Sequence, residues 1–443
     1  MLRQTTPGRR STTWITAVLL AAATLAVWLY GSHADTAEPQ WFKGQTHCHS
    51  YWSDGDHFPE VVALKYKEAG FHFLCISDHN VLKRGQRAVK LHGKKTPRLI
   101  EKSLAEYRER FGDEWVEIHG EGEAATVRLK TLDEFQGLVE EPGRFLLIES
   151  EEITTKPQGK QVHVNALNLG ELIPPDIADT PVATLRHHVL AVGEQSRRLG
   201  RPILAHVNHP GWPKYDVPPE DVAGVPEIRF FELCNNGDGS NHFGDSQHPG
   251  MEQFWDIVCA IRLGQMKALP VYGVASDDTH RYHPDDPDYV GKGLGRGWIT
   301  VRAAELTPEA LLAAMDRGDF YATTGVELKR LHYDAKAGTL EVAVAAEPGV
   351  EYRIEFVGTP VDFAHRPGPK RRGYPASVAE VLSETVGTTA AYRLTGNELY
   401  VRAVVRSDKR LANPPVGAVE VGVAWTQPVG WEKRVKPAAA GGD

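Results

Sequence analysis

Residues 58–80 read FPEVVALKYKEAGFHFLCISDHN, which predicts a helix followed at once by a buried strand. Pro59 suits the first turn of a helix, and Gly70 suits its C-terminal cap. The mainly apolar run at residues 71–76 is typical of a strand, and the polar residues 77–80 follow where that strand ends. A helix that leads into a strand with polar side chains at its end is the repeating unit of an α/β fold.

The same alternation continues on both sides, from Trp41 to about Val301. Helix-like segments separate most of the further runs that are predicted as strands, namely residues 144–149, 161–169, 202–207, 228–233 and 270–275. Strands alternating with helices are typical of βα units and a parallel sheet. The sequence therefore predicts an α/β domain over residues 41–325.

Three segments depart from this rhythm. Residues 81–143 are strongly charged, with a helix predicted around 99–111, and form either a cap over the site or a solvated surface insertion. After a last helix that begins at Thr307, residues 326–431 alternate with a period of two, which predicts a small β-sandwich-like domain. A loose Ala/Gly tail at residues 432–443 completes the chain.

The first chemical cluster is QTHCHSYWSDG at residues 45–55, at the end of the first predicted strand. His47 and His49 are two positions apart, so in extended backbone their side chains share a face and can bind one ion. Cys48 would point to the opposite face. A His-x-His pair is a weak signal by itself, because histidines are common both in cores and on surfaces.

Further candidate ligands follow the other predicted strands. They are Asp78 and His79, Glu151 and Glu152, His206 and His209, and Asp277, Asp278 and His280, while His163 lies inside its own strand. In a β/α barrel the carboxyl ends of the strands form one face, where side chains from distant parts of the sequence meet. So many ionisable groups need compensating charge when they are buried together, which predicts bound metal.

Imidazole and carboxylate donors without thiolate suit zinc, manganese or iron rather than calcium or magnesium alone. The candidates exceed one tetrahedral shell, so we expect about two or three divalent transition ions per chain. The cysteines at positions 48, 75, 234 and 259 lack the spacing of a zinc ribbon or a disulfide scaffold and are predicted to be buried free thiols.

Taken in order, these motifs resemble the PHP (polymerase and histidinol phosphatase) superfamily. The matching segments are His47-x-His49, Ser53-Asp54-Gly55, Ser77-Asp78-His79-Asn80, Glu152-Ile153-Thr154-Thr155, His209-Pro210-Gly211 and Asp278-x-His280. The segments FYATTG at 320–325 and AWTQP at 424–428 are similar to the branch of carbaryl-hydrolase-type (CehA/McbA) metallohydrolases. Over residues 41–431, the resemblance implies a PHP-type distorted (β/α)7 barrel with a three-metal site and a C-terminal β-sandwich-like domain.

The resemblance also implies which residues hold the ions. One ion would be bound by His47, His49, Glu152 and Asp278. Glu152 would bridge to a second ion bound by His163 and His209, and a third would be bound by Asp54, His79 and His280. Asp277 stays an alternative to Asp278, and His206 stays an alternative to His209.

The expected activity is hydrolysis by metal-activated water, because coordination lowers the pKa of water from about 15.7 towards 7. The sequence contains no Gly-x-Ser-x-Gly elbow or Walker loop, which argues against a serine hydrolase or an NTPase. We expect a small-molecule substrate with a phosphoester or a carboxylic or carbamate ester, and Trp212, Asn235 and Arg281 are candidate substrate-binding residues. The alternative is a catalytically silent, metal-stabilised barrel that binds a cell-envelope ligand.

Residues 1–34 have the pattern of an export leader. Arg9 and Arg10 precede an uncharged apolar run at 14–30, and the SHA sequence at 32–34 suits cleavage. The run is also nearly long enough to span a bilayer, so cleavage and retention as a membrane anchor both stay open. We expect an exported protein that is periplasmic or otherwise extracytoplasmic. Without the leader, 47 basic and 58 acidic residues remain, and this acidic balance argues against a nucleic-acid partner.

Overall fold

The computed structural model describes residues 38–235, 237, 241–289, 292–365, 370–371, 374–375, 377–414 and 419–435. The chain from Gln40 onward forms one compact unit. The predicted leader at residues 1–34 and most of the predicted tail, from residue 436, lie outside the described residues. Within the described part of the chain, no helix combines the length and the apolar character needed to cross a membrane.

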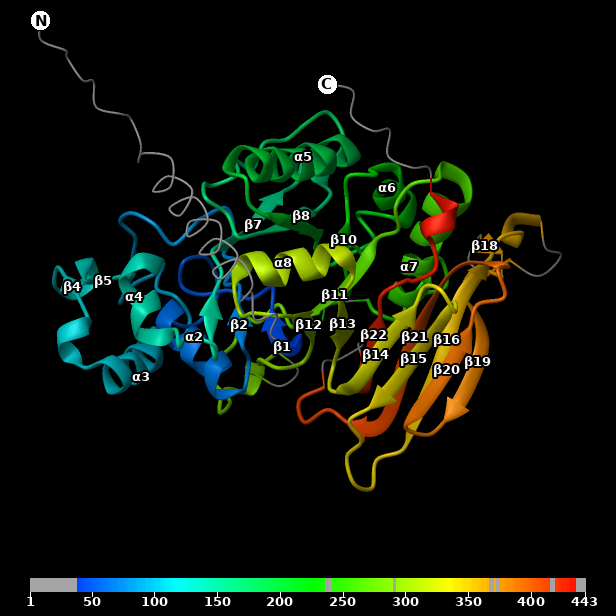
Figure 1. Ribbon diagram of the computed structural model, residues 1–443. Helices are drawn as coiled ribbons and strands as arrows, with labels where there is room; N and C mark the ends of the chain where they lie inside the picture. The colour runs from blue at the N-terminus through cyan, green and yellow to red at the C-terminus, as the bar shows by residue number, and fades with distance from the viewer. Residues whose placement is uncertain are drawn as a thin grey trace, which may run out of the picture. The chain divides into compact units, whose positions relative to one another are not determined.

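Two sheets hold most of the strands (Figure 1). The first has nine strands in the order β19 (Glu380–Val386), β16 (Tyr352–Pro360), β21 (Glu398–Arg410), β22 (Val421–Thr426), β13 (Phe320–Thr323), β12 (Trp298–Ala303), β1 (Gln40–Gln45), β2 (Phe73–Leu74) and β6 (Leu146–Leu147). The second has five strands in the order β11 (Tyr272–Ser276), β10 (Phe230–Asn235), β9 (Leu204–Val207), β8 (Val162–Leu167) and β7 (Ser150–Thr155).

Helices connect many of these strands. They are α2 (Pro59–Glu68), α5 (Pro181–Leu199), α6 (Pro219–Gly224), α7 (Met251–Cys259), which continues as a π-helical segment over Ala260–Met266, and α8 (Pro308–Arg317). The predicted α/β class is confirmed, and every strand predicted between residues 71 and 275 overlaps an observed one. Helices such as α5 and α7 follow the buried strands β8 and β10 in the sequence, which produces the alternation of apolar segments and helices.

The sheets are mixed, so the prediction of a parallel sheet was wrong in part. β1 pairs in parallel with β2, and β10 pairs in parallel with β9 and β11. β8, in contrast, pairs antiparallel with both β7 and β9. The reason lies in the connection between β7 and β8, which is too short for the crossover that parallel neighbours require.

The strand ladders of the described residues do not close into a barrel, so the predicted (β/α)7 barrel is not confirmed. Two isolated parallel bridges instead join the two large sheets. One pairs Cys48, after β1, with Thr279, after β11, and the other pairs His79, after β2, with Glu152 in β7. Both bridges lie at the carboxyl ends of β1 and β2, which brings the polar residues that follow these strands together.

The helix that was predicted at the start of residues 58–80 is confirmed as α2. Pro59 is its first residue, and Gly70 follows the C-cap with a positive φ of 77°. Val62 and Tyr66 on the inner face of α2 are fully buried and pack in one cluster with Phe71. Burial of each such large apolar side chain stabilises the fold by roughly 1.5–3 kcal/mol.

Residues 81–143 form a folded insertion. It contains α3 (Ile100–Phe111), α4 (Leu132–Val139) and a three-stranded sheet of β3 (Ala88–Lys90), β5 (Thr126–Arg128) and β4 (Ile118–His119). The apolar side chains of α3 and of the small sheet share a core with Tyr51, Trp52 and Phe58, which come from the loop before α2 and its N-cap. Those of α4 pack against α2 instead. The predicted helix around 99–111 is therefore present and packed against the part of the chain that contains Asp54.

The strands after residue 326 also form a second layer. β14 (Leu328–Asp334), β15 (Thr339–Val344) and β20 (Thr389–Arg393) make a three-stranded sheet. Its inner side chains, such as Leu340 and Val342, pack with Ile354 and Phe356 of the nine-stranded sheet. A short hairpin of β17 (Lys370–Arg371) and β18 (Tyr374–Pro375) extends from this region. The two packed layers have a sandwich-like arrangement, and β22 joins them to the β/α part by pairing with β13.

Candidate metal centre

The candidate ligands from the sequence converge where the two large sheets meet. His47, His49, His79, His209, Asp278 and His280 follow strands, whereas Glu152 and His163 lie inside β7 and β8. A cavity of about 370 Å³ opens at this place. The described residues that line it are Asp54, His79, Glu152, His163, His209, Trp212, Asn235, Asp278, His280, Arg281, Lys292 and Arg296. None of them belongs to the insertion at 81–143.

His47, His49 and Asp278 form the innermost group. The two histidine Nε2 atoms lie 3.2 Å apart, and Asp278 Oδ1 lies 3.2 Å from His47 Nε2 and 3.1 Å from His49 Nε2. Two imidazole nitrogens bound to one tetrahedral ion at 2.0–2.1 Å would be about 3.4 Å apart. The spacing therefore fits a shared ion, and both histidines are fully buried.

Glu152 lies between this group and the others, with each carboxylate oxygen facing a different set of imidazoles. Its Oε2 lies 3.5 Å from both His47 Nε2 and His49 Nε2 and 2.8 Å from His79 Nδ1. Its Oε1 lies 2.9 Å from His163 Nδ1 and 3.4 Å from His209 Nε2. One carboxylate can therefore contact two ions from opposite sides, which is the arrangement expected of a bridging ligand.

Glu152, His163 and His209 form the second group. His209 has a φ of 25°, and Asp278 of the innermost group has a φ of 47°, both in the left-handed region that non-glycine residues avoid. Such backbone costs about 1–3 kcal/mol per residue and persists where the surrounding structure requires it. With this backbone, His209 faces Glu152 at 3.4 Å, and Asp278 faces His47 and His49.

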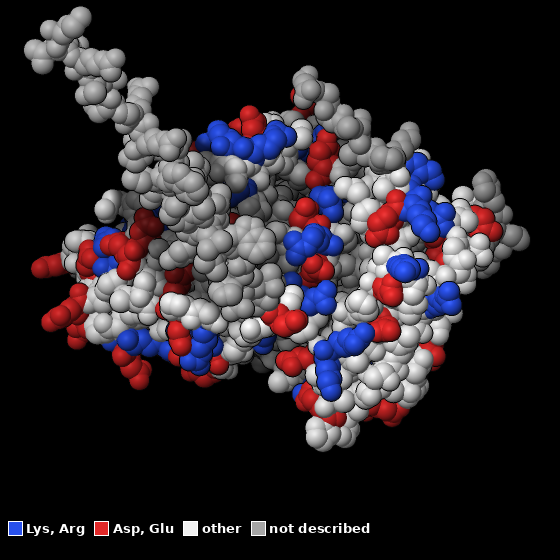
Figure 2. Space-filling view, in the orientation of Figure 1, with Lys and Arg blue, Asp and Glu red and all other residues white. Residues whose placement is uncertain are grey.

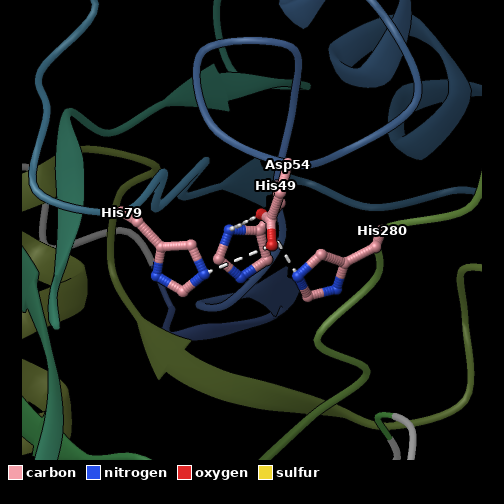
Figure 3. A group of neighbouring side chains, drawn as sticks. All are labelled: His49, Asp54, His79 and His280. Carbon is pink, nitrogen blue, oxygen red and sulfur yellow. Dashed lines mark ion pairs between the residues drawn. The ribbon is translucent and has the colours of Figure 1, made fainter. Parts of the chain in front are cut away.

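The outermost group contains His49, Asp54, His79 and His280 (Figure 3). Asp54 Oδ1 lies 3.3 Å from His280 Nε2 and 3.7 Å from His49 Nδ1, and its Oδ2 lies 3.6 Å from His79 Nε2. The Asp54 side chain is 56% exposed, so this group borders solvent. Gly55 lets the loop fold back, because a Cβ there would lie 2.6 Å from the carbonyl of His49.

The donors fit divalent transition ions. The three groups contain imidazole and carboxylate atoms without thiolate, and Cys48 points its Sγ towards the carbonyl of Cys75 instead. Glu152 Oε2 accepts no hydrogen bond from the described residues, although it is buried among three imidazoles. A buried carboxylate oxygen without a donor is costly unless a cation compensates it.

Glu152 and His49 carry the charges that a cation requires of its ligands. Burial alone would raise the pKa of Glu152, but His79 and His47 outweigh it and hold this pKa well below its usual range. Burial, together with His280 and His79, lowers the pKa of His49 to about 4. At neutral pH the carboxylate is therefore ionised and this imidazole is neutral, which are the forms that bind metal.

The geometry favours one member of each pair that the sequence left open. Asp278 faces His47 and His49, whereas Asp277 accepts hydrogen bonds from Tyr66 Oη at 2.8 Å and from the backbone N–H of Gly295 at 2.6 Å. His209 belongs to the second group, whereas His206 belongs to none of the groups found in the described residues. The ligand roles themselves stay predictions.

Glu232 in β10 is a functional residue that the sequence reasoning missed. Its Oε1 accepts hydrogen bonds from His47 Nδ1 at 2.7 Å and from Ser276 Oγ at 2.5 Å. Its Oε2 accepts from the His209 backbone N–H at 2.7 Å and from Asn235 Nδ2 at 2.8 Å. This contact favours the His47 tautomer with its proton on Nδ1 and leaves Nε2 facing His49 and Asp278, where an ion would bind. The sequence feature that could have identified Glu232 is an acidic residue within the otherwise mainly apolar strand FFELCN.

Glu232→Gln is expected to weaken metal binding about 10- to 100-fold, the usual effect of losing a carboxylate that orients a ligand histidine. A glutamine also offers one acceptor oxygen where four donors converge. Titration of the metal-free protein with Zn²⁺ against a competing chelator measures the change. The control is Glu227→Gln, which removes a surface pair with Arg186. Equal affinities for wild type and Glu232→Gln would contradict the orienting role.

The predicted substrate-binding residues Trp212, Asn235 and Arg281 all line the cavity. Trp212 packs edge-on against His209, with ring centroids 5.1 Å apart. Asn235 donates to Glu232 and, at 3.1 Å, to Asp278 Oδ2, so its amide also holds the metal centre together. Lys292 and the buried Arg296 add positive charge to the same cavity, and Arg296 was also missed from the sequence.

No family model and no curated protein matches this chain. The solved structures that are weakly similar include the following two. One is a two-domain protein from Bacteroides vulgatus that contains a predicted PHP-like metal-dependent phosphoesterase; it is 14% identical, covers 88% of this chain and 95% of its own, and has a TM-score of 0.37. The other, from Bifidobacterium adolescentis, is inferred to be a metal-dependent phosphoesterase; it is 12% identical, covers 56% of this chain and 91% of its own, and has a TM-score of 0.27. A likeness at this level carries no argument about function, which must come from the side chains of the site.

Proposed function

We propose that the protein is an exported metal-dependent hydrolase that cleaves an ester bond with water. The observation that carries the proposal is the position of Glu152, with one oxygen facing His47, His49 and His79 and the other facing His163 and His209. Export rests on the predicted leader, and N-terminal sequencing that begins at Asp35 would establish its cleavage.

In this proposal one group of residues binds the ions and another positions the substrate. Divalent ions at such a centre lower the pKa of water and stabilise the negative charge that develops on an ester. The described residues that line the cavity include no serine, threonine or cysteine, so water is the proposed nucleophile. Trp212 supplies an apolar wall, and Arg281 and Lys292 supply positive charge to the cavity.

We also propose the finer fold and family assignment. β1, β2 and β7 to β11 together with the two bridges would form an incomplete ring of strands around the centre. This arrangement, with the ligand order along the chain, supports a PHP-type (β/α)7 barrel of the carbaryl-hydrolase-type branch. A sandwich-like domain at residues 326–431 completes the proposed architecture.

A phosphoester is the substrate class that the cavity supports best. Arg281 and Lys292 line it together with Arg296, and three cations beside a metal centre favour an anionic substrate. Arg281 Nε is buried and has no hydrogen-bond partner among the described residues, so it is available to a ligand. A carboxylic or carbamate ester is the second candidate, which the apolar face of Trp212 favours.

A substrate screen with an arginine variant separates these classes. We expect the metal-loaded protein to hydrolyse chromogenic phosphoesters faster than carboxylic esters. Arg281→Ala should then raise KM for the phosphoester roughly 10-fold or more, since a charged hydrogen bond contributes about 1.5–3 kcal/mol. The control is Arg330→Ala, whose exposed side chain pairs with Glu341.

Preference for a carboxylic or carbamate ester, with no effect of Arg281→Ala on KM, would support the second candidate. Turnover of neither class, with ions bound, would favour a binding module instead. On the face drawn in Figure 2, basic and acidic side chains are interspersed. This face therefore gives no support to a nucleic-acid partner, and none is proposed.

A further inference from the structure

Helix α3 of the insertion contacts two loops that both contain residues of the outermost metal group. One loop connects His49 to α2 and contains Asp54, and the other follows β11 and contains His280 (Figure 3). The loops contact each other directly, since the Asp56 N–H donates to the carbonyl of His280 at 3.0 Å. Because Asp54 is more than half exposed, its position depends on what holds these loops.

Ser103 on α3 joins both loops through one hydroxyl. Ser103 Oγ donates to the carbonyl of Asp56 at 2.7 Å and lies 2.8 Å from His283 Nε2. Tyr51 Oη donates to Ser103 Oγ at 2.8 Å. The hydroxyl has one proton, so it donates to Asp56 and accepts from Tyr51 and His283. The Ser103 side chain is fully buried, and this hydrogen-bonding set is complete.

An ion pair of Arg98, which lies just before α3, makes a second connection of the same kind. The Arg98 guanidinium donates to Asp286 Oδ1 at 2.7 Å and lies 3.7 Å from Asp56 Oδ2. Asp56 in turn accepts from the backbone N–H of Tyr282 at 2.9 Å. The insertion thus contacts the Asp54 loop and the His280 loop at two separate places.

The side chains of His57, Glu106 and His283 are also close enough to be considered as an ion site. Their atoms already have partners. His57 Nδ1 accepts from the Phe58 N–H at 2.9 Å, which leaves the proton on Nε2 facing Glu106 at 3.0 Å. Glu106 also pairs with Lys65 at 2.7 Å. A cation there would have to displace these protons and charges, so the trio is better explained as a junction between α3 and the loops.

We propose that α3 positions Asp54 and His280 and thereby sets the affinity of the outermost metal group. This inference rests on the proposed metal function and gives the insertion a role other than covering the cavity. The inner ligands His47 and Glu152 lie outside the two loops that α3 joins. Asp278 shares a loop with His280, but its carboxylate accepts from Asn235 Nδ2 at 3.1 Å and faces His47 and His49. A defect in α3 should therefore weaken the outermost site far more than the inner ones.

The test uses Ser103→Ala in the full chain, with Glu101→Ala as a control at an exposed position of the same helix. Titration of the metal-free proteins with Mn²⁺ and Zn²⁺ measures affinity for each ion separately. We expect the weakest-bound ion to lose affinity about 10- to 100-fold in Ser103→Ala, while the tighter sites and the control keep wild-type values. A double-mutant cycle with His283→Ala should show coupling, because both side chains share one hydrogen bond.

Unchanged affinity for every ion in Ser103→Ala would overturn the inference while leaving the proposed hydrolase intact. An equal loss at all sites, with a lower Tm, would also overturn it, because it would indicate general destabilisation. Wild-type protein that binds no ion would refute the proposed function itself. If Ser103→Ala does not fold, Arg98→Ala replaces it, since that side chain is partly exposed and forms the second contact.

Discussion

Glu152→Gln is expected to abolish nearly all turnover, by at least about 10³-fold, and to lower metal content while the protein stays folded. Glutamine keeps the size of the side chain but loses the charge that offsets repulsion between neighbouring cations. Glu152 presents one oxygen to His79 and the other to His163. In the glutamine variant an amide nitrogen would replace one of these two oxygens. Metal analysis and kcat of the purified variant measure both effects, and circular dichroism checks the fold.

Glu151→Gln is the matched control, one residue away on the same strand. Glu151 points to the other face of β7, where its Oε1 accepts from the Ile173 N–H at 2.7 Å. We expect kcat and metal content to stay within about twofold of wild type, because no candidate ligand contacts it. If Glu151→Gln were the damaging change and Glu152→Gln harmless, the bridging role of Glu152 would be wrong.

The Glu151→Gln variant should also differ from wild type in how its folding stability depends on pH. Burial raises the pKa of Glu151 to about 8, above its value of about 4.3 in an unfolded chain. The folded state therefore binds the proton more tightly, so this stabilisation is complete below pH 4 and is lost as pH rises towards 8. Because glutamine resembles the protonated acid, urea unfolding should show Glu151→Gln gaining stability over wild type between pH 5 and 8.

Metal removal is expected to abolish activity completely and reversibly. The protein as purified should contain about two or three transition ions per chain, because the ligand atoms exceed one tetrahedral shell. Dialysis against a chelator should remove the metal ions and abolish turnover. Addition of zinc or manganese should restore turnover. Elemental analysis together with a rate assay checks this result.

The decisive comparison is between metal content and activity at each stage of chelation. Turnover that persists after all transition metal has been removed would contradict the proposed chemistry. A metal content near zero after expression in metal-supplemented medium would contradict the ligand assignment itself. Removal of metal should also lower Tm, because ions that bind only the folded chain stabilise it.

Much of the site could be predicted because strand geometry is local. His47 and His49 share a face in any extended backbone, and Asp78-His79 follows its strand whatever the sheet order. The helix at 59–68 was predictable for the same reason, since Pro59 and Gly70 specify its ends in sequence. These features depend only on neighbouring residues.

Other parts of the site depend on contacts between distant residues. Glu232 was missed because its partners, His47 and Asn235, come together only when β10 lies beside the end of β1. The antiparallel pairing of β8 was missed because apolar runs do not specify the direction of their neighbours. The role of Ser103 was also invisible, because a single serine in a charged helix has no sequence signal.

The α/β class and the types and order of the candidate ligands can be read from the sequence, because periodicity and residue chemistry are properties of short segments. That Asp278 rather than Asp277 faces the histidines, and that His209 rather than His206 faces Glu152, depends on the folded chain. Asp278 and His209 both have a positive φ, whereas Asp277 and His206 do not, and this difference changes the direction of the side chain. Those choices depend on how the two sheets meet at the bridges beside Cys48 and His79, which no local pattern specifies.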